Sequence, residues 1–330
     1  MRRTTILLFF FFTLLLLAAA SAFGQSSSEQ QTLKVRTELV NVGVLARQKK
    51  TGRIINDLSK DDFTILEDGI KQTISHFSQE RLPLSIILLV DRAGCINAFN
   101  DQIREATIAA FAQLKAEDEV AIMTFSNKVD LAQPFTRDRQ SIADSIMSVD
   151  RQHRTEQHYF NAGVHEAANY MSKAGNPIGR RAIIVLTSIE ASVDFSQISE
   201  KEALEAVLES GAVVSGVLVK TLGATFEQGI RGKPTSLLRH VGFPAGSLKM
   251  FVEETGGELI GAAPERMNET LVDLVDHLAQ SYSLAYLPTN SARDGKRRRI
   301  KVELSPEVEK REGKTVLLTR RSYIMPKDLN

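Results

Sequence analysis

The chain has a single cysteine, Cys95, among its 330 residues, so it cannot form an internal disulfide. Its stability therefore has to come from a hydrophobic core. Neither sign of charge is in excess, with 41 Lys and Arg against 40 Asp and Glu, and no field that would attract nucleic acid is expected. The sequence also lacks an internal repeat, a glycine-rich phosphate loop, a His-Glu-x-x-His motif and a Cys-x-x-Cys motif.

Long apolar stretches are confined to the first residues of the chain. Arg2 and Arg3 precede an apolar run at 6–17, and Ala-Ser-Ala at 20–22 is typical of a cleavage site, which predicts a secretory signal peptide over 1–24. The run is short for a membrane span of about 20 residues, so an uncleaved anchor is the weaker alternative. No cysteine follows the signal to carry a lipid. We expect a secreted or periplasmic protein with no membrane insertion after cleavage.

The most informative stretch is an unbroken apolar run at 86–90 that ends at Asp91. A short run without alternation indicates a strand buried on both faces, which is typical of parallel sheets. Similar runs at 119–125, 181–187 and 212–219 are separated by segments with helical spacing. This alternation predicts a mostly parallel α/β sheet with helices on both faces. Functional residues are expected at the carboxyl ends of such strands, where Asp91 stands.

Both ends of the mature chain have β patterns instead. Strand alternation, a helical turn capped by Ser59 and a hairpin turn at 68–69 characterise the N-terminal part, and three further strands are expected near the C-terminus. Each segment has too few strands to be stable alone, so we expect the two to pack as one β domain. The predicted organisation is a disordered lead at 25–32, β segments at 33–80 and 281–325, and an α/β domain at 81–280.

Three separated parts of the sequence resemble a bacterial family of secreted proteins related to von Willebrand factor A, abundant in Acidobacteria. These parts are 58–69 with 83–91, then 253–258, and finally 282–289 with 294–296 and 320–323. The resemblance implies export and a von Willebrand A-like (Rossmann-like) fold. It does not imply one biochemical activity.

In that family, Asp-x-Ser-x-Ser begins a metal-ion-dependent adhesion site, and a later threonine and aspartate complete it. The corresponding positions in this chain are Asp91, Ala93, Cys95, Gln157 and Ser188. One of five ligand types is retained, and a lone carboxylate cannot hold Mg²⁺ tightly. The resemblance therefore implies a degenerate site and no metal cofactor. A weak Mg²⁺ site using Thr155 and Glu190 as substitute ligands is the alternative.

Cys95 offers a second kind of chemistry, because a thiolate after a strand and before a helix can be stabilised there. His153 or His158 could serve as its base in a Cys-His nucleophile. No oxyanion pattern accompanies them, so we expect no enzyme, and a Cys95-dependent hydrolase is the less favoured alternative. For Arg92 two interpretations stay open: pairing with Asp91, or solvation.

The leading hypothesis is an exported, non-catalytic protein-interaction module of the adhesion type, with a largely lost metal site. A divalent-cation-dependent adhesin is the alternative. The candidate partner-binding face consists of Asp91, Arg92, Cys95, His158, Ser188 and Glu190. The basic run at 296–301 is interpreted as a solvated strand face. The long stretch at 223–246 is either functional or a plain insertion.

Overall fold

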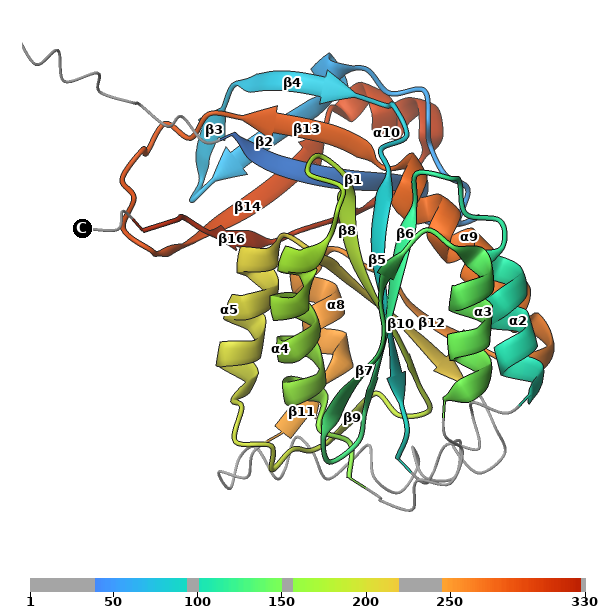
Figure 1. The fold of residues 1–330 in the computed structure, drawn as a ribbon. Coiled ribbons are helices and arrows are strands. Elements are labelled where there is room, and N and C mark those ends of the chain that lie inside the picture. The colour runs from blue at the N-terminus through green and yellow to red at the C-terminus, as the bar shows by residue number, and fades with distance from the viewer. Residues whose placement is uncertain (1–38, 94–100, 150–156, 220–244, 328–330) are drawn as a thin grey trace, which may run out of the picture. The chain divides into compact units, whose positions relative to one another are not determined.

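The computed structural model describes residues 39–93, 101–149, 157–219 and 245–327 (Figure 1). All of these belong to one compact unit, Leu39–Asn330. The predicted signal peptide and lead lie outside the described residues, as do Cys95, His153, Thr155 and nearly all of the stretch at 223–246.

A six-stranded sheet forms the centre of the α/β part, in the order β12-β10-β8-β5-β6-β7. Its strands are β5 (Leu84–Asp91), β6 (Glu119–Phe125), β7 (Val129–Thr136), β8 (Arg180–Thr187), β10 (Val213–Val219) and β12 (Leu259–Ala262). Five of them run parallel, and β7 pairs antiparallel with β6 at the edge. Every residue of β5 is buried, so the sheet is covered on both faces, which confirms the predicted α/β class.

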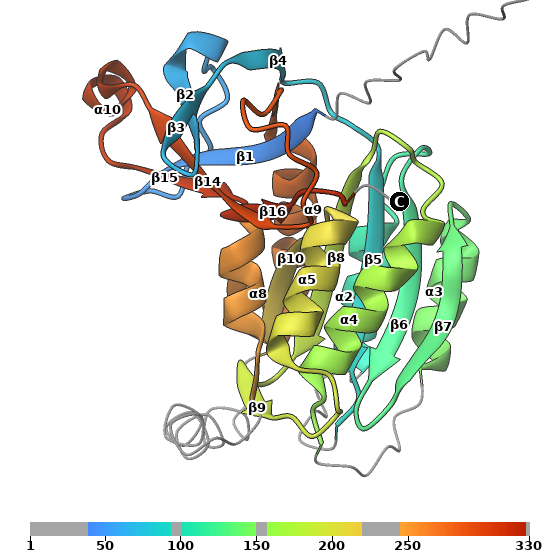
Figure 2. The same ribbon diagram turned by 90° about the vertical axis from the view of Figure 1, so that its left-hand side faces the viewer.

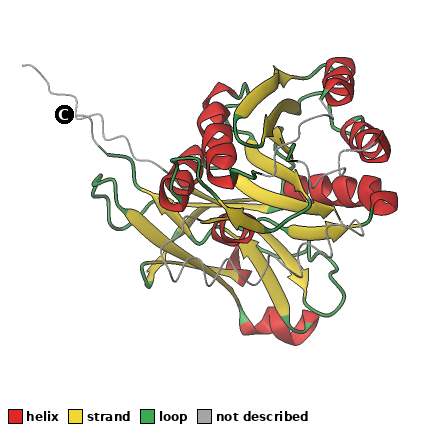
Figure 3. Cartoon of the chain, turned by 90° about the horizontal axis from the view of Figure 1, so that it is seen from below, coloured by secondary structure: helices red, strands yellow, loops and turns green. Residues whose placement is uncertain are grey.

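Helices cover both faces of this sheet (Figures 1 and 3). One face carries α2 (Asp101–Phe111), α3 (Arg139–Ser148) and α9 (Met267–Gln280), and the other carries α4 (Phe160–Tyr170), α5 (Glu200–Ser210) and α8 (Leu248–Thr255). Each face of the sheet packs against its helices in a separate hydrophobic core. Side chains of β5 alternate between the two cores, with Leu88 packed on the α2 side and Leu89 on the α4 side. No described helix is long and apolar enough to span a membrane.

The N- and C-terminal β segments form two four-stranded sheets around a third core, here called the β module. Its strands are β1 (Val40–Gln48), β2 (Phe63–Glu67), β3 (Ile70–Gln72), β4 (Ile74–Ser78), β13 (Tyr282–Tyr286), β14 (Arg297–Leu304), β15 (Thr315–Thr319) and β16 (Ser322–Ile324). The two segments interleave, because β1 pairs with β13 and β15 while β2 pairs with β14. The ribbon places this module beside the amino ends of the parallel strands (Figures 1 and 2), whereas Asp91 is the last residue of β5.

Some local elements differ from the sequence-based expectation. The predicted hairpin is short: β3 pairs with β2, but the chain then changes sheet at Thr73, and β4 pairs with β13. Hydrophobic alternation alone cannot reveal such a crossing, because both strands still face the same core. A helix, α10 (Pro306–Glu312), and a small sheet of β9 (Ala191–Val193) and β11 (Ala245–Ser247) were not anticipated. Short 3₁₀ turns occupy η1 (Lys60–Asp62), η3 (Met171–Lys173) and η4 (Pro264–Arg266).

Most of the basic run at 296–301 is exposed, as expected of a solvated strand face, and Arg298 is the one basic residue in it that is buried. Arg297 pairs with Glu254 of α8, and Arg298 is buried and contacts Glu67 at 3.5 Å. Lys301 pairs with Glu303 at 2.6 Å on the exposed face of β14. The charges of Arg297, Arg298 and Lys301 therefore form ion pairs within the chain.

Candidate functional site

Asp91 ends β5 and is buried, with 1% of its surface exposed. Its Oδ1 accepts a hydrogen bond from the Ala93 N–H at 2.9 Å. Its Oδ2 accepts one from the Thr187 hydroxyl at 2.7 Å and lies 2.7 Å from His158 Nδ1. Both carboxylate oxygens are thus already engaged by groups of the chain itself.

Thr187 reaches Asp91 because β8 runs parallel beside β5. Val90 and Leu186 are in register, so the last residues of the two strands lie side by side. The Thr187 hydroxyl also accepts a hydrogen bond from the Ile189 N–H at 3.2 Å, which orients it at the start of the following loop. A single hydroxyl thereby connects the strand end to Asp91 and to the loop.

His158 approaches from the segment before α4 and is 1% exposed. The neighbouring Tyr159 N–H donates to the Ser126 carbonyl at 3.0 Å, which ties this segment to the end of β6. The imidazole stacks on the ring of Phe160, with centroids 6.3 Å apart. Packing and backbone bonds therefore hold the imidazole against Asp91.

These residues do not fit a divalent metal of the Mg²⁺ kind. Such an ion needs a nearly octahedral shell of oxygen ligands, and position 93 has no side-chain oxygen. The Asp91 carboxylate is held by contacts to the Ala93 N–H and His158, and the Thr187 hydroxyl donates to it. In the part of the chain that the structure describes, no group of three or more His, Cys, Asp and Glu side chains could hold a metal ion.

The structure gives Arg92 a different neighbour from either sequence-based interpretation. Its guanidinium lies 4.0 Å from the Asp130 carboxylate on β7, while its backbone N–H donates to the Phe125 carbonyl at 2.8 Å. The partners of Asp91 are instead His158, Thr187 and the Ala93 N–H. Thr187 was missed by sequence reasoning, although it directly precedes Ser188 at the end of an apolar strand.

The residues of the candidate partner-binding face separate into two groups. Asp91, His158 and Ser188 are buried, whereas Arg92 and Glu190 are partly exposed. Phe195 was not considered from the sequence, yet 54% of its surface is exposed in the loop after β9. That loop is fixed because Asp194 accepts hydrogen bonds from the Asn161 N–H at 2.7 Å and the Ser196 N–H at 3.0 Å.

One further hollow lies elsewhere on the described surface and shares no residue with the Asp91 cluster. It has a volume of about 530 Å³ and lies between strands β6 and β7, at the edge of the six-stranded sheet, and helix α4. Its lining residues are Met123, Val129, Leu131, Glu166, Asn169, Tyr170 and Lys173.

Comparison with known proteins agrees with this architecture. Residues 86–190 match the family described as von Willebrand factor type A domain. The fold of this part is von Willebrand A-like. The matched residues begin in β5 and extend past Ser188, so they contain Asp91, His158 and Thr187.

Solved structures with a similar fold share little sequence with this A-like domain. The conserved hypothetical protein BatB from Bacteroides thetaiotaomicron is 15% identical, with 60% of this chain and 100% of that chain covered and a TM-score of 0.44. PilB minor pilin from Streptococcus sanguinis is 12% identical, with 62% and 63% covered and a TM-score of 0.42. Proximal thread matrix protein 1 from the mussel byssus, with a zinc-occupied MIDAS motif, is 14% identical, with 64% and 49% covered and a TM-score of 0.44. No curated protein matches the chain.

Proposed function

We propose that this chain is an exported, non-catalytic protein-interaction module whose metal-ion-dependent adhesion site has been replaced by contacts within the chain. The observation that carries the proposal is the engaged Asp91 carboxylate, which holds the imidazole of His158 and the hydroxyl of Thr187. An A-like domain that binds partners through a metal needs an open coordination position on that ion. In this chain the Asp91 carboxylate is buried and bonded to other residues of the protein, so we place recognition on the side chains around the same edge.

The exposed chemistry at this edge is a mixture of charge and apolar surface. Arg92 and Glu190 follow the ends of neighbouring strands β5 and β8, and the aromatic ring of Phe195 extends from the next loop. Aromatic residues, phenylalanine included, and arginine are enriched in protein interfaces relative to the rest of the surface. A partner protein that contacts this edge would therefore bind independently of divalent cations.

Capture of a partner from the native envelope fraction tests the proposal. The bait is the mature chain, compared with the triple variant Arg92→Ala, Glu190→Ala and Phe195→Ala. A matched control carries Lys201→Ala and Glu205→Ala, which removes an exposed ion pair on α5. We expect the same protein to be captured in Mg²⁺ and in EDTA by the wild type and the control, and lost with the triple variant.

Other outcomes would favour the other hypotheses. Capture that disappears in EDTA would indicate a cation-dependent adhesin with Thr155 and Glu190 as substitute ligands. A hydrolytic activity of the wild type that is lost in Cys95→Ala would indicate an enzyme. Export is tested separately, because N-terminal sequencing of the mature protein should begin near residue 23 or 25, after the predicted signal.

A further inference from the structure

A buried carboxylate connects three segments at the amino ends of the parallel strands, the opposite end of the sheet from Asp91. Glu258 precedes β12 and is 7% exposed. Its Oε2 lies 2.8 Å from Arg47 Nη1 on β1, and its Oε1 lies 2.6 Å from His277 Nδ1 on α9. One carboxylate therefore holds a cation of the β module and an imidazole of the α/β part at the same time.

These contacts lie at the joint between the two parts of the unit. Helix α9 ends at Gln280, and β13 of the β module begins two residues later at Tyr282. Arg180 of β8 secures the turn between them, donating to the Leu278 carbonyl at 3.1 Å and to the Ser283 hydroxyl at 2.9 Å. Weaker bonds to Glu258 would therefore weaken the contact between the β module and the six-stranded sheet.

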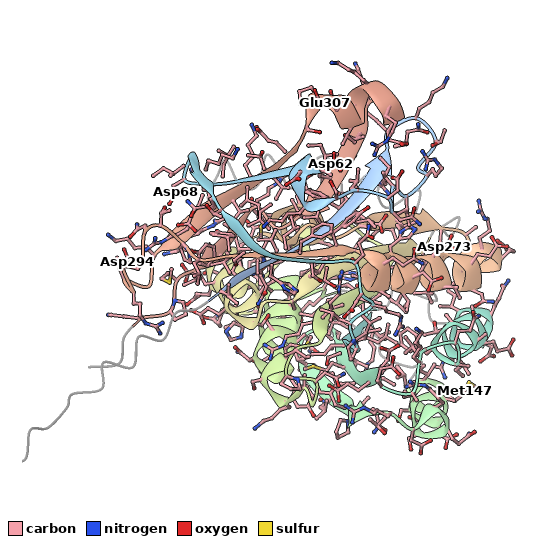
Figure 4. All side chains as sticks on the ribbon, turned by 90° about the horizontal axis from the view of Figure 1, so that it is seen from above. Asp62, Asp68, Met147, Asp273, Asp294 and Glu307 are labelled. Carbon is pink, nitrogen blue, oxygen red and sulfur yellow. The ribbon has the colours of Figure 1, made fainter. Side chains whose placement is uncertain are left out.

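Three charged groups act on the imidazole of His277. Glu258 faces it from the start of β12, Arg47 from β1, and Asp273, labelled in Figure 4, from the preceding turn of its own helix. Arg180 approaches the same helix end from β8. The hydrogen bond to Glu258 raises the pKa of His277, with smaller contributions of the same sign from the Glu258 and Asp273 charges, while burial and Arg47 oppose the rise.

We propose that Arg47, Glu258 and His277 form a pH-sensitive clamp that fastens the β module to the α/β domain. Protonated His277 and Arg47 together neutralise the buried Glu258 carboxylate. When His277 loses its proton, Glu258 keeps one full counter-charge and the joint loosens. This inference concerns the joint alone and does not depend on the proposed partner-binding edge.

The direction of the pH dependence follows from the raised pKa. The extra stabilisation is fully present below the pKa of an unfolded histidine, about 6.5, and is lost as the pH rises through the higher pKa of the folded state. The clamp is therefore tight in mildly acidic surroundings and loose in alkaline ones.

Amide hydrogen exchange of the full mature chain between about pH 5.5 and about pH 8.5 tests the clamp, a range that spans the ordinary histidine pKa. After correction for the chemical exchange rate, we expect the end of β1 and the segment from Glu258 through β12 to lose protection severalfold as the pH rises. His277→Gln keeps a hydrogen-bond donor but cannot titrate, so its protection should not vary with pH. His165→Gln is the control, because His165 forms a separate pair with Glu166 at the surface.

A second measurement keeps the test decisive if His277→Gln folds poorly. The ring resonances of His277 should titrate above the ordinary histidine range in the wild type and closer to it in Glu258→Gln. Protection that keeps its pH dependence in His277→Gln would overturn the proposal. A wild-type His277 that titrates below about 6.5 would do the same.

Discussion

Asp91 and His158 are 67 positions apart in the sequence, yet Asp91 Oδ2 and His158 Nδ1 lie 2.7 Å apart with both side chains buried. Buried polar groups are expensive unless they are paired, so each residue depends on the other for its place in the interior. His158 therefore contacts the same carboxylate that, in the family resemblance, binds a metal ion. The pair is a structural contact at the position where the family resemblance places a metal ligand.

The first prediction concerns this pair. His158→Ala leaves a buried acceptor short of a partner and should lower the free energy of unfolding by about 1–3 kcal/mol, the usual cost of leaving a buried hydrogen-bonding group unsatisfied. His165→Ala, at the partly exposed histidine of α4, should stay within about 0.5 kcal/mol. Urea unfolding monitored by circular dichroism measures both. Equal effects of the two substitutions would mean that the Asp91 contact contributes little.

Divalent cations should not stabilise the protein. A ligand at 100 times its dissociation constant adds about 2.7 kcal/mol to the folded state, which is readily detected as a rise in melting temperature. Because the Asp91 oxygens are engaged, we expect no change in Tm with millimolar Mg²⁺ or Ca²⁺. A clear rise would contradict the proposed loss of the metal site and support the adhesin alternative.

Rebuilding the family pattern gives a complementary prediction. The four restoring substitutions are Ala93→Ser, Cys95→Ser, Gln157→Thr and Ser188→Asp. Because His158 occupies Asp91 Oδ2, these four alone should yield weak cation-dependent stabilisation, and adding His158→Ala should strengthen it. The measurement is the Tm of each variant with and without Mg²⁺. Equal responses with and without His158→Ala would show that the imidazole does not obstruct the site.

The β module is held by a buried network around Glu67. Its Oε2 accepts hydrogen bonds from the Tyr286 hydroxyl at 2.7 Å and the Tyr323 hydroxyl at 2.8 Å. Burial, followed by the bond to Glu67, raises the pKa of both phenols, so they stay neutral donors. Tyr286→Phe should cost about 1.5–3 kcal/mol, the range for hydrogen bonds to charged groups. Tyr170→Phe, which keeps its ring stacked on Phe135, is the control and should cost far less.

Two glycines in the left-handed region allow a test of close packing. Gly256 after α8 has φ of 77° and Gly211 after α5 has φ of 72°, but a Cβ on Gly256 would lie 2.2 Å from the Thr319 backbone, whereas the nearest atom to a Cβ on Gly211 is an Arg320 side-chain nitrogen at 4.0 Å. Gly211→Ala should cost only the left-handed strain of about 1–2 kcal/mol. Gly256→Ala should cost clearly more, because α8 and β15 must separate. Thermal unfolding of the two variants compares them, and equal losses would contradict a tight contact at Thr319.

Much of the α/β part could be predicted because its signals are local. An apolar run buried on both faces identifies β5. The Ser59 turn was likewise expected, since capping depends on residues only a few positions apart. The crossing at Thr73 was not, because two strands of equal pattern can continue one sheet or change to another.

The candidate site shows the same division. Residue type and position along the chain were enough to predict that Asp91 ends a buried strand and that positions 93 and 188 lack the ligands of the family pattern. The side chains that contact this carboxylate could not be predicted, because they come from distant segments. Thr187 arrives through the register of β8 beside β5, and His158 through the packing of the segment before α4. Such contacts depend on how segments that are distant in the sequence pack together in the interior, and the local sequence pattern of one segment does not predict that.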